Sequence, residues 1–220
     1  MAFKKQFFLI VLVILILSII FSSLLYLFKK STFTEYEITH RYEQRKNEFH
    51  SIINARKTLL VALADSLVQN HEVHRAYLND DRNIIIDNFE DMWKTFQKSN
   101  LVSEIHFFKS KTTSFVNFSN IKKYNMDVKD IRQDIDWVAS TFIPSTHFLV
   151  CRLFPGLRAT YPIVIDNTLY GSVSLGIDLD KINTHIQEMH PDLVSYFILN
   201  DEKLKSSLLS EKYEAHVQNH

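Results

Sequence analysis

One arginine and four small residues occupy alternating positions in two neighbouring stretches of the sequence, residues 157–165 and 169–179. They are Arg158, Thr160, Ser172, Ser174 and Gly176. Successive side chains of a β-strand point to opposite faces, so these residues share one sheet face if the two stretches pair with their polar sides together. Small residues leave room on such a face, and an arginine gives that room a preference for anions. We expect this face to hold a ligand.

The chemistry of Arg158 indicates the class of ligand. A guanidinium stays charged and presents a fork of N–H donors, which matches a carboxylate held in two hydrogen bonds. The hydroxyl groups of Thr160, Ser172 and Ser174 share its face in the sequence pattern and can bind the remaining polar atoms of a small molecule. We therefore predict a small organic acid or an amino acid, bound mainly through Arg158.

Four further residues are candidates to contact this ligand. They are Arg152, Tyr161, Trp137 and Tyr124. Arg152 would add a second cation, and an aromatic residue would form a wall of the cavity. Each candidate has a structural alternative. The arginines can pair with Asp166 or Asp178 on the sheet surface, and the aromatic residues can belong to the hydrophobic core.

The sequence gives little support to other chemistries. It contains no glycine-rich phosphate loop, no G-x-S-x-G and no H-E-x-x-H motif, so we do not expect an enzyme. The single cysteine, Cys151, excludes an intrachain disulfide and a cysteine-based metal site. His71 and His74 lack a third ligand nearby, which favours a solvated helix end, and we expect no metal and no cofactor. The 25 basic and 25 acidic residues leave no net charge that would favour nucleic acid as a partner.

The proposed ligand face requires a β-hairpin, and the sequence predicts one. The two stretches are rich in β-branched and aromatic residues and are separated by Asp166-Asn167-Thr168, which suits a tight turn. Further strands are expected at 105–108, 114–118 and 147–154, with a turn at Pro155-Gly156 and a helix at 127–142. Tight turns join only antiparallel neighbours, so we predict an α+β fold with a five-stranded antiparallel sheet.

Helices are expected to precede the sheet. From a cap at Ser31 or Thr32 to about residue 70 the sequence contains no Gly or Pro, and it is polar in its lower half and apolar in its upper half. This pattern predicts a long stalk helix whose upper half packs on a domain, and a coiled-coil dimer is a hypothesis for it. Residues 71–99 are expected to form a helical pair with a break at Asn79-Asp80-Asp81.

The first residues predict a membrane anchor. Residues 6–28 carry no charge and would form roughly 35 Å of helix, which is enough to cross a bilayer. A cleaved signal peptide is the alternative, but the apolar run is long and no small-residue cleavage site follows it. Lys4 and Lys5 favour a cytoplasmic stub at residues 1–5, a transmembrane helix at 6–28 and a location outside the cytoplasm for the remainder.

The order of these elements resembles the Cache sensor domains of bacterial transmembrane receptors, in particular the membrane-distal half of a double Cache domain. The motifs that carry the resemblance are Arg158-x-x-x-Pro162 with Tyr170-Gly171-Ser172-Val173-Ser174-Leu175-Gly176-Ile177, and Ile105-His106-Phe107 with Ser114-Phe115. The resemblance implies a PAS-like sensor unit at 101–182, after a stalk and helical pair at 31–100. Residues 183–220 would begin a second, membrane-proximal unit, with a helix that Pro191 ends and a strand at Val194–Leu199.

The resemblance also implies a function. Such a chain is the input module of a bacterial signal-transduction receptor, such as a chemoreceptor or two-component sensor, in the inner membrane with its sensor domain in the periplasm. It would bind a small molecule, form a homodimer and signal through its long helix to a histidine kinase, diguanylate cyclase or chemoreceptor signalling module. The alternative is a single-pass envelope scaffold that binds a partner protein and no small molecule. A cavity on the Arg158 face would favour the sensor.

Overall fold

The computed structural model describes residues 2–191, 197–208 and 214. Two compact units divide the chain, Met1–Ser51 and Ile52–His220, and each is described by itself. Helix α1 (Ala2–Val68) contains all the described residues of the first unit and also begins the second.

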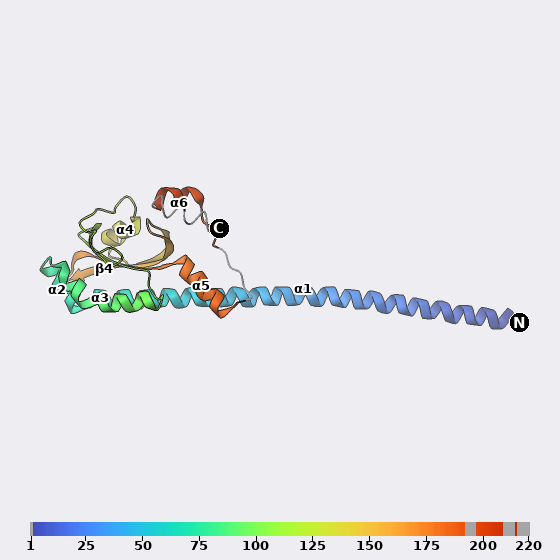
Figure 1. The fold of residues 1–220 in the computed structure, drawn as a ribbon. Coiled ribbons are helices and arrows are strands. Elements are labelled where there is room, and N and C mark those ends of the chain that lie inside the picture. Colours follow the sequence, from blue (N-terminus) through green and yellow to red (C-terminus); the bar gives the residue numbers. More distant parts are fainter. Residues whose placement is uncertain (1, 192–196, 209–213, 215–220) are drawn as a thin grey trace. The chain divides into compact units, whose positions relative to one another are not determined.

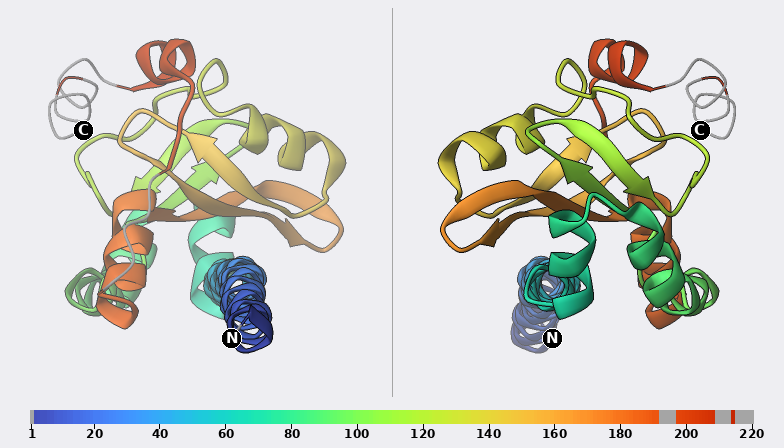
Figure 2. Two further views of the ribbon diagram at one scale, coloured as in Figure 1. Left: turned by 90° about the vertical axis from the view of Figure 1, so that its right-hand side faces the viewer. Right: turned by 90° about the vertical axis from the view of Figure 1, so that its left-hand side faces the viewer.

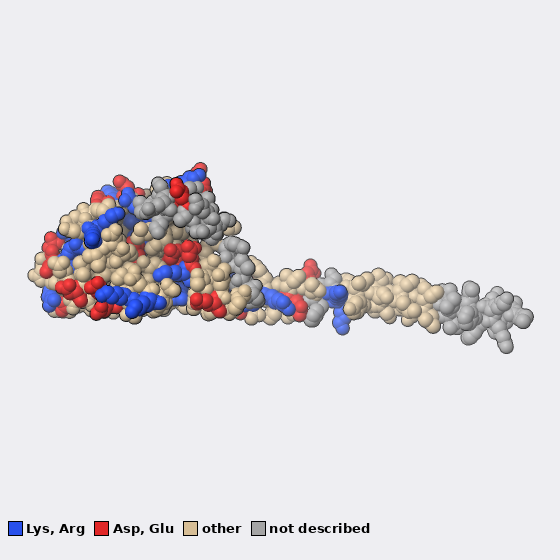
Figure 3. All heavy atoms as spheres, viewed as in Figure 1, with Lys and Arg blue, Asp and Glu red and all other residues tan. Residues whose placement is uncertain are grey.

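The first unit is helical without interruption (Figure 1). Among the described residues, one helix, Ile14–Val68, contains a window long and apolar enough to cross a membrane. The following turns are polar and carry ion pairs one turn apart, such as Arg45–Glu48 at 3.1 Å. Figure 3 shows the contrast between a stretch of α1 without charges and the mixed charges beyond it. The predicted new helix start at Ser31 or Thr32 is wrong, because no Gly or Pro interrupts the helical hydrogen bonds there.

The second unit begins with the apolar end of α1 and a helical pair. Leu60, Ala64 and Leu67 of α1 are buried, as their helical spacing predicts. Helices α2 (His71–Leu78) and α3 (Arg82–Lys98) follow, and each starts at a side-chain cap. The Asp81 carboxylate accepts a hydrogen bond from the Asn83 N–H at 3.0 Å, so the predicted break before α3 is confirmed.

The described residues form one five-stranded antiparallel sheet with the strand order β2-β1-β5-β4-β3. The strands are β1 (Glu104–Lys109), β2 (Thr113–Asn117), β3 (Ser145–Val150), β4 (Pro155–Ile165) and β5 (Thr168–Asp178). The β4–β5 turn places Asp166 and Asn167 at positive φ, 49° and 61°, which these residue types tolerate better than most. The α+β fold and the predicted hairpin are therefore confirmed.

Helices cover both faces of this sheet. Figure 2 shows α3 and α5 (Leu179–Met189) on one side and α4 (Gln133–Thr141) on the other. The side with α3 and α5 is apolar, and the rings of Phe89 and Phe107 pack there at 6.5 Å between centroids. Ile182 and Ile186 of α5 are buried as well. The opposite side carries the polar residues, and a short helix, α6 (Asp201–Ser207), contacts β3.

Three boundaries predicted from the sequence are wrong. The helix expected from Asp127 begins at Gln133, because the Asp127 carboxylate accepts hydrogen bonds from the Thr112 hydroxyl and the Lys129 N–H in a turn. The third strand ends at Val150 instead of Phe154. Pro155-Gly156 is not a turn but the start of β4, where Gly156 pairs with a residue on each neighbouring strand. Of the predicted strand at 194–199, residues 194–196 lie outside the described residues, and residues 197–199 do not form a strand.

Candidate functional site

A cavity of about 150 Å³ lies against the polar face of the sheet. It is lined by Glu104, His106, Ser114, Asn117, Asn120, Lys123, Met126, Val128, Ile131, Arg132, Cys151, Arg152, Leu153 and Arg158. These residues come from β1, β2, β4, the loop after β2 and the β3–β4 connection. One water needs about 10–15 Å³ of such volume, so the cavity has room for a molecule of several heavy atoms.

The sheet register places the predicted polar face as expected. Arg158 on β4 pairs with Gly176 on β5, and Thr160 pairs with Ser174, so the polar sides of the two strands coincide. The arginine itself uses the space that glycine leaves, because a Cβ added at Gly176 would lie 2.8 Å from Arg158 Nη1. The room above Gly176 is thus occupied by the guanidinium, and the cavity opens beside it.

Arg158 is buried and only partly satisfied. Its Nη1 donates to the Glu104 carboxylate of β1, and its guanidinium carbon lies 4.6 Å from the centre of the Phe154 ring. The side chain is 1% exposed. Its Nε and Nη2 atoms have no hydrogen-bond partner among the residues that the structure describes. These two atoms form one edge of the guanidinium, the edge that a carboxylate binds with both oxygens.

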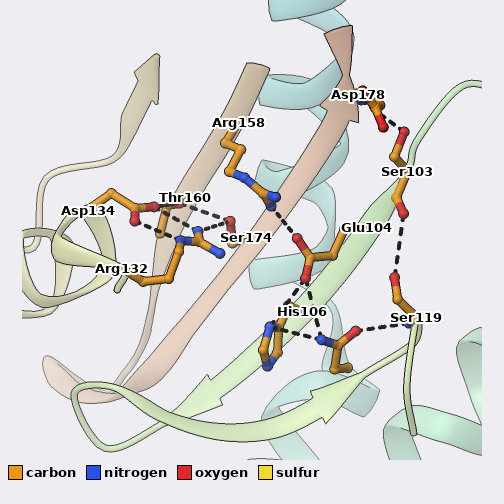
Figure 4. A network of polar contacts seen from close by, with 11 residues as sticks. Ser103, Glu104, His106, Ser119, Arg132, Asp134, Arg158, Thr160, Ser174 and Asp178 are labelled. Carbon is orange, nitrogen blue, oxygen red and sulfur yellow. Dashed lines mark hydrogen bonds and ion pairs between the residues drawn. The ribbon is translucent and has the colours of Figure 1, made fainter. Parts of the chain in front are cut away.

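Glu104 connects Arg158 to a polar cluster on β1 and β2 (Figure 4). The Asn117 amide N–H group lies 3.4 Å from Glu104 Oε1 and 3.3 Å from His106 Nδ1, and His106 Nε2 lies 2.8 Å from the Ser114 hydroxyl. Burial raises the pKa of Glu104, but the charge of Arg158 and the hydrogen bond with His106 hold this pKa far below its usual range. Burial lowers the pKa of His106, so the imidazole is neutral at pH 7.

A second buried ion pair lies beside the first. Arg132 donates from Nε and Nη2 to the two oxygens of Asp134, both at 2.8 Å, and from Nη2 to the Ser174 hydroxyl at 2.7 Å. The Thr160 hydroxyl donates to Asp134 at 2.8 Å and lies 3.1 Å from Ser174. Burial raises the pKa of Asp134, but the charge of Arg132 lowers it to about 2. The Nε and Nη2 edge of Arg132 is therefore bound to a carboxylate of the chain itself, whereas the same edge of Arg158 has no partner among the described residues.

The predicted site residues fall into three groups. Arg158 and Arg152 line the cavity. Thr160 and Ser174 do not line it, and their hydroxyls bond to Asp134 and Arg132. Ser172 does not line it either and is buried with its hydroxyl unpaired among the described residues. The expected alternative partners of Arg158, Asp166 and Asp178, are not its partners, because Glu104 fills that role.

The three aromatic candidates do not line the cavity. Tyr161 pairs with Val173 and thus lies on the opposite face of the sheet, the one with α3 and α5. Burial raises the pKa of Tyr161, and the charge of Asp65 on α1 raises it further. Trp137 and Tyr124 are each 46% exposed, and Tyr124 stacks with Arg82, whose guanidinium carbon lies 4.0 Å from the ring centre. Neither residue belongs to the core or to the wall of this cavity.

The sequence reasoning missed the acidic half of the site. Glu104 and His106 alternate on β1 just as the hairpin residues do, and that pattern could have placed them on the polar face. Asp134 also belongs to this half, and it is buried in its pair with Arg132, two residues away. Lys123 and Asn117 lie on a loop and a strand end, where spacing carries little information.

Comparison with known proteins identifies the family. Residues 36–218 match the family model of a double sensory domain of two-component sensor kinases, dCache_3. The extracellular domain of the predicted histidine kinase vpHK1S-Z8 is 16% identical, with a TM-score of 0.50, over 63% of this chain and 56% of that one. A domain of a sensory box/GGDEF family protein from Vibrio parahaemolyticus also has 16% identity and a TM-score of 0.50, over 63% of this chain and 59% of that one.

The E. coli DcuS sensor domain is similar as well, with 14% identity and a TM-score of 0.47 over 62% of this chain and 98% of that one. The chain thus spans less than two thirds of the length of the first two relatives. A search of curated proteins finds no match. Because the family model covers most of the sequence, the chain belongs to the double Cache family of receptor sensor domains and is a sensory domain, not an enzyme.

Proposed function

We propose that this chain is the membrane-anchored, extracytoplasmic input module of a bacterial signal-transduction receptor and that it binds a small organic acid or amino acid in the cavity beside Arg158. One observation carries the proposal. Arg158 lines the cavity, and its Nε and Nη2 donors are buried and have no described partner. Burying N–H donors of a charged group without partners is costly, and a ligand carboxylate would satisfy both.

The neighbouring ion pair supports the same chemistry. Arg132 presents its Nε and Nη2 edge to Asp134 at 2.8 Å for both contacts, which is the two-oxygen geometry of a carboxylate. Arg158 has the same edge available and lines a space large enough for a small molecule. A cavity on this face also favours a ligand sensor over a scaffold that binds only a partner protein.

Signalling through α1 is part of the proposal. Arg158 and Tyr161 belong to the same strand, β4, but Arg158 faces the cavity and Tyr161 faces the helices, where Asp65 of α1 influences it. A ligand that pulls on Arg158 would shift β4 and thereby the contacts of Tyr161. Such a shift requires that the ligand bind the two arrangements with different affinity.

The binding test compares arginine with lysine at position 158. Lysine keeps a positive charge for Glu104 but lacks the Nε and Nη2 edge. Purified full chain in detergent would be screened by thermal shift with small carboxylic acids and amino acids, and calorimetry would give the affinity of the best ligand. We expect Arg158→Lys to weaken binding roughly tenfold or more. Arg75→Lys on α2, away from the cavity, is the matched control, and equal affinities for all three proteins would remove Arg158 from the site.

Two experiments test the membrane arrangement. A reporter enzyme that is active only in the periplasm, fused after His220, is expected to be active, and activity of only a cytoplasmic reporter would contradict the topology. Cysteine pairs placed along residues 35–45 are expected to crosslink between subunits with a ligand-dependent yield. No crosslinking at any position would argue against a homodimer in which these helices lie side by side.

A further inference from the structure

The loop after β2 forms one wall of the cavity, because Asn120, Lys123 and Met126 of this loop line it. Both ends of the loop are bonded to β2 through backbone N–H groups. The Asn120 N–H donates to a β2 carbonyl oxygen at 3.0 Å, and the Asn125 N–H donates to another at 2.7 Å. We refer to residues 121–124, which lie between these two bonds, as the crest of the loop.

Arg82, the first residue of α3, contacts the crest in two ways. Its Nη2 donates to the Ile121 carbonyl oxygen, and its guanidinium carbon lies 4.0 Å from the centre of the Tyr124 ring. Among the residues that the structure describes, no other side chain from outside the loop forms a hydrogen bond or a ring contact with residues 121–124. One guanidinium therefore holds both the beginning and the end of the crest.

The position of Arg82 does not serve helix α3 itself. The dipole of a helix favours acidic residues in the first turn and disfavours a cation there. The side chain is also partly buried, and its Nε is buried without a partner among the described residues. Both effects oppose an arginine at this position, and its two contacts with the crest offset them.

The turn before Arg82 is attached to the sheet as well. Asp80 in this turn pairs with Lys109 at the end of β1, with 3.0 Å between the carboxylate oxygen and Nζ. The start of α3 is thus connected to β1 through Asp80 and to the cavity wall through Arg82.

We infer that Arg82 is a positioning residue that holds the crest against the start of α3 and thereby shapes the cavity from outside it. Arg82 does not line the cavity, so a substitution there would act on the cavity only through the loop. The contact also links the cavity to the helical pair that follows α1, by a route that does not pass through β4. The inference adds a control to the cavity of the proposed function, but its test needs no ligand, so either proposal can fail without the other.

Trypsin cleavage within the crest measures how often the crest opens. Lys122 and Lys123 are exposed cleavage sites, and proteolysis of a folded chain proceeds through the locally opened form. Purified full chain in detergent would be digested briefly, and mass spectrometry would give the initial rate of cleavage at both sites. Each rate is divided by that of a synthetic peptide of residues 118–127 with the same substitution, which removes direct effects on the protease. Lys111, exposed in the β1–β2 turn, is the internal reference.

Arg82→Met removes both contacts and should speed cleavage in the crest about tenfold or more. Tyr124→Leu removes only the ring contact and should speed it about two- to fivefold. The double variant should be no faster than Arg82→Met, because the ring has no partner once the guanidinium is gone. Arg82→Lys keeps a charge and a donor and should lie between wild type and Arg82→Met. Tyr124→Phe keeps the ring and should match wild type.

Cleavage after Lys111 should be unchanged in every variant. Equal acceleration after Lys111 and in the crest would mean that Arg82 stabilises the whole unit and does not position the loop. An unchanged rate in Arg82→Met would mean that the crest keeps its place without this contact. A double variant faster than Arg82→Met by the full factor of Tyr124→Leu would mean that the two residues act independently. Each of these three results would overturn the inference.

Discussion

The buried pair of Arg158 and Glu104 allows a test that separates folding from binding. Both side chains are nearly inaccessible, at 1% and 5% exposure, and each neutralises the other. Replacing Arg158 by Met leaves a buried carboxylate without its cation, and replacing Glu104 by Gln leaves a buried guanidinium without its anion. The double replacement removes both charges together, so it should avoid most of the cost that each single replacement incurs.

The magnitudes follow from the burial. Breaking a buried ion pair from one side costs about 3–5 kcal/mol, whereas replacing both partners by neutral groups is often nearly neutral. A domain of this size has about 5–15 kcal/mol of stability, so each single variant should lose a large part of it. We expect the double variant to be more stable than the sum of the single effects predicts, by about 3 kcal/mol or more. Glu90 and Lys94, exposed and 3.3 Å apart on α3, serve as the control pair, with at most about 1 kcal/mol of coupling.

Urea unfolding of the full chain in detergent, followed by tryptophan fluorescence, is a suitable assay. The two tryptophans, Trp93 and Trp137, both lie in the second unit and therefore report on the unit that contains the pair. The reasoning would be refuted by single variants that lose less than about 1 kcal/mol, or by a double variant whose loss equals the sum of both single losses. A stable double variant that no longer binds carboxylates would separate the two roles of Arg158.

Three further predictions concern stability. The pKa of His106 is lowered in the folded state, so just below pH ~6.5 only the unfolded chain binds a proton at this imidazole. The free energy of unfolding should therefore fall by up to about 1.4 kcal/mol for each pH unit below that point. His106→Gln should flatten this part of the profile of melting temperature against pH, and an unchanged profile would show that the imidazole is not buried in solution. A Cβ at Gly171 would lie 1.9 Å from the Phe108 carbonyl oxygen, whereas one at Gly176 would meet the movable end of Arg158; Gly171→Ala should therefore lower the melting temperature far more than Gly176→Ala, and the reverse order would contradict the packing. Asn167 has a positive φ of 61°, so Asn167→Gly should stabilise the hairpin by about 0.5–1 kcal/mol in urea unfolding, and a loss of stability would show that the asparagine side chain supports the turn.

The sequence was sufficient for features that depend on neighbours along the chain. Alternation in residues 157–179 predicted which side chains of β4 and β5 share a face, because the side-chain period of a strand is fixed and the turn sets the register. The break before α3 was predictable for the same reason, since Asp81 caps the helix with its own side chain. In these cases the physical cause lies within a few residues of its effect.

The site depends on pairs that are distant in the sequence, and these were not predictable. Arg158 and Glu104 are separated by 54 positions, so the alternation on β1 can indicate the face of Glu104, but nothing local identifies Arg158 as its partner. Tyr161 illustrates the opposite error. Tyr161 is three residues after Arg158 on the same strand, so the alternation of side chains already placed it on the other face. It was predicted to contact the ligand because it is aromatic, although the strand geometry argued against this.

The single thiol of the chain gives direct experimental access to the cavity. Cys151 lines it and is 5% exposed, so a reagent must enter this space to reach the sulfur. Because the chain has no other cysteine, the rate of alkylation reports on a single position and requires no substitution. A molecule bound in the cavity would slow the alkylation of Cys151 in proportion to its occupancy, so the alkylation rate measures binding to the unmodified protein. The same thiol must be replaced before any crosslinking between introduced cysteines in α1 is interpreted, because Cys151 would otherwise compete for the oxidant.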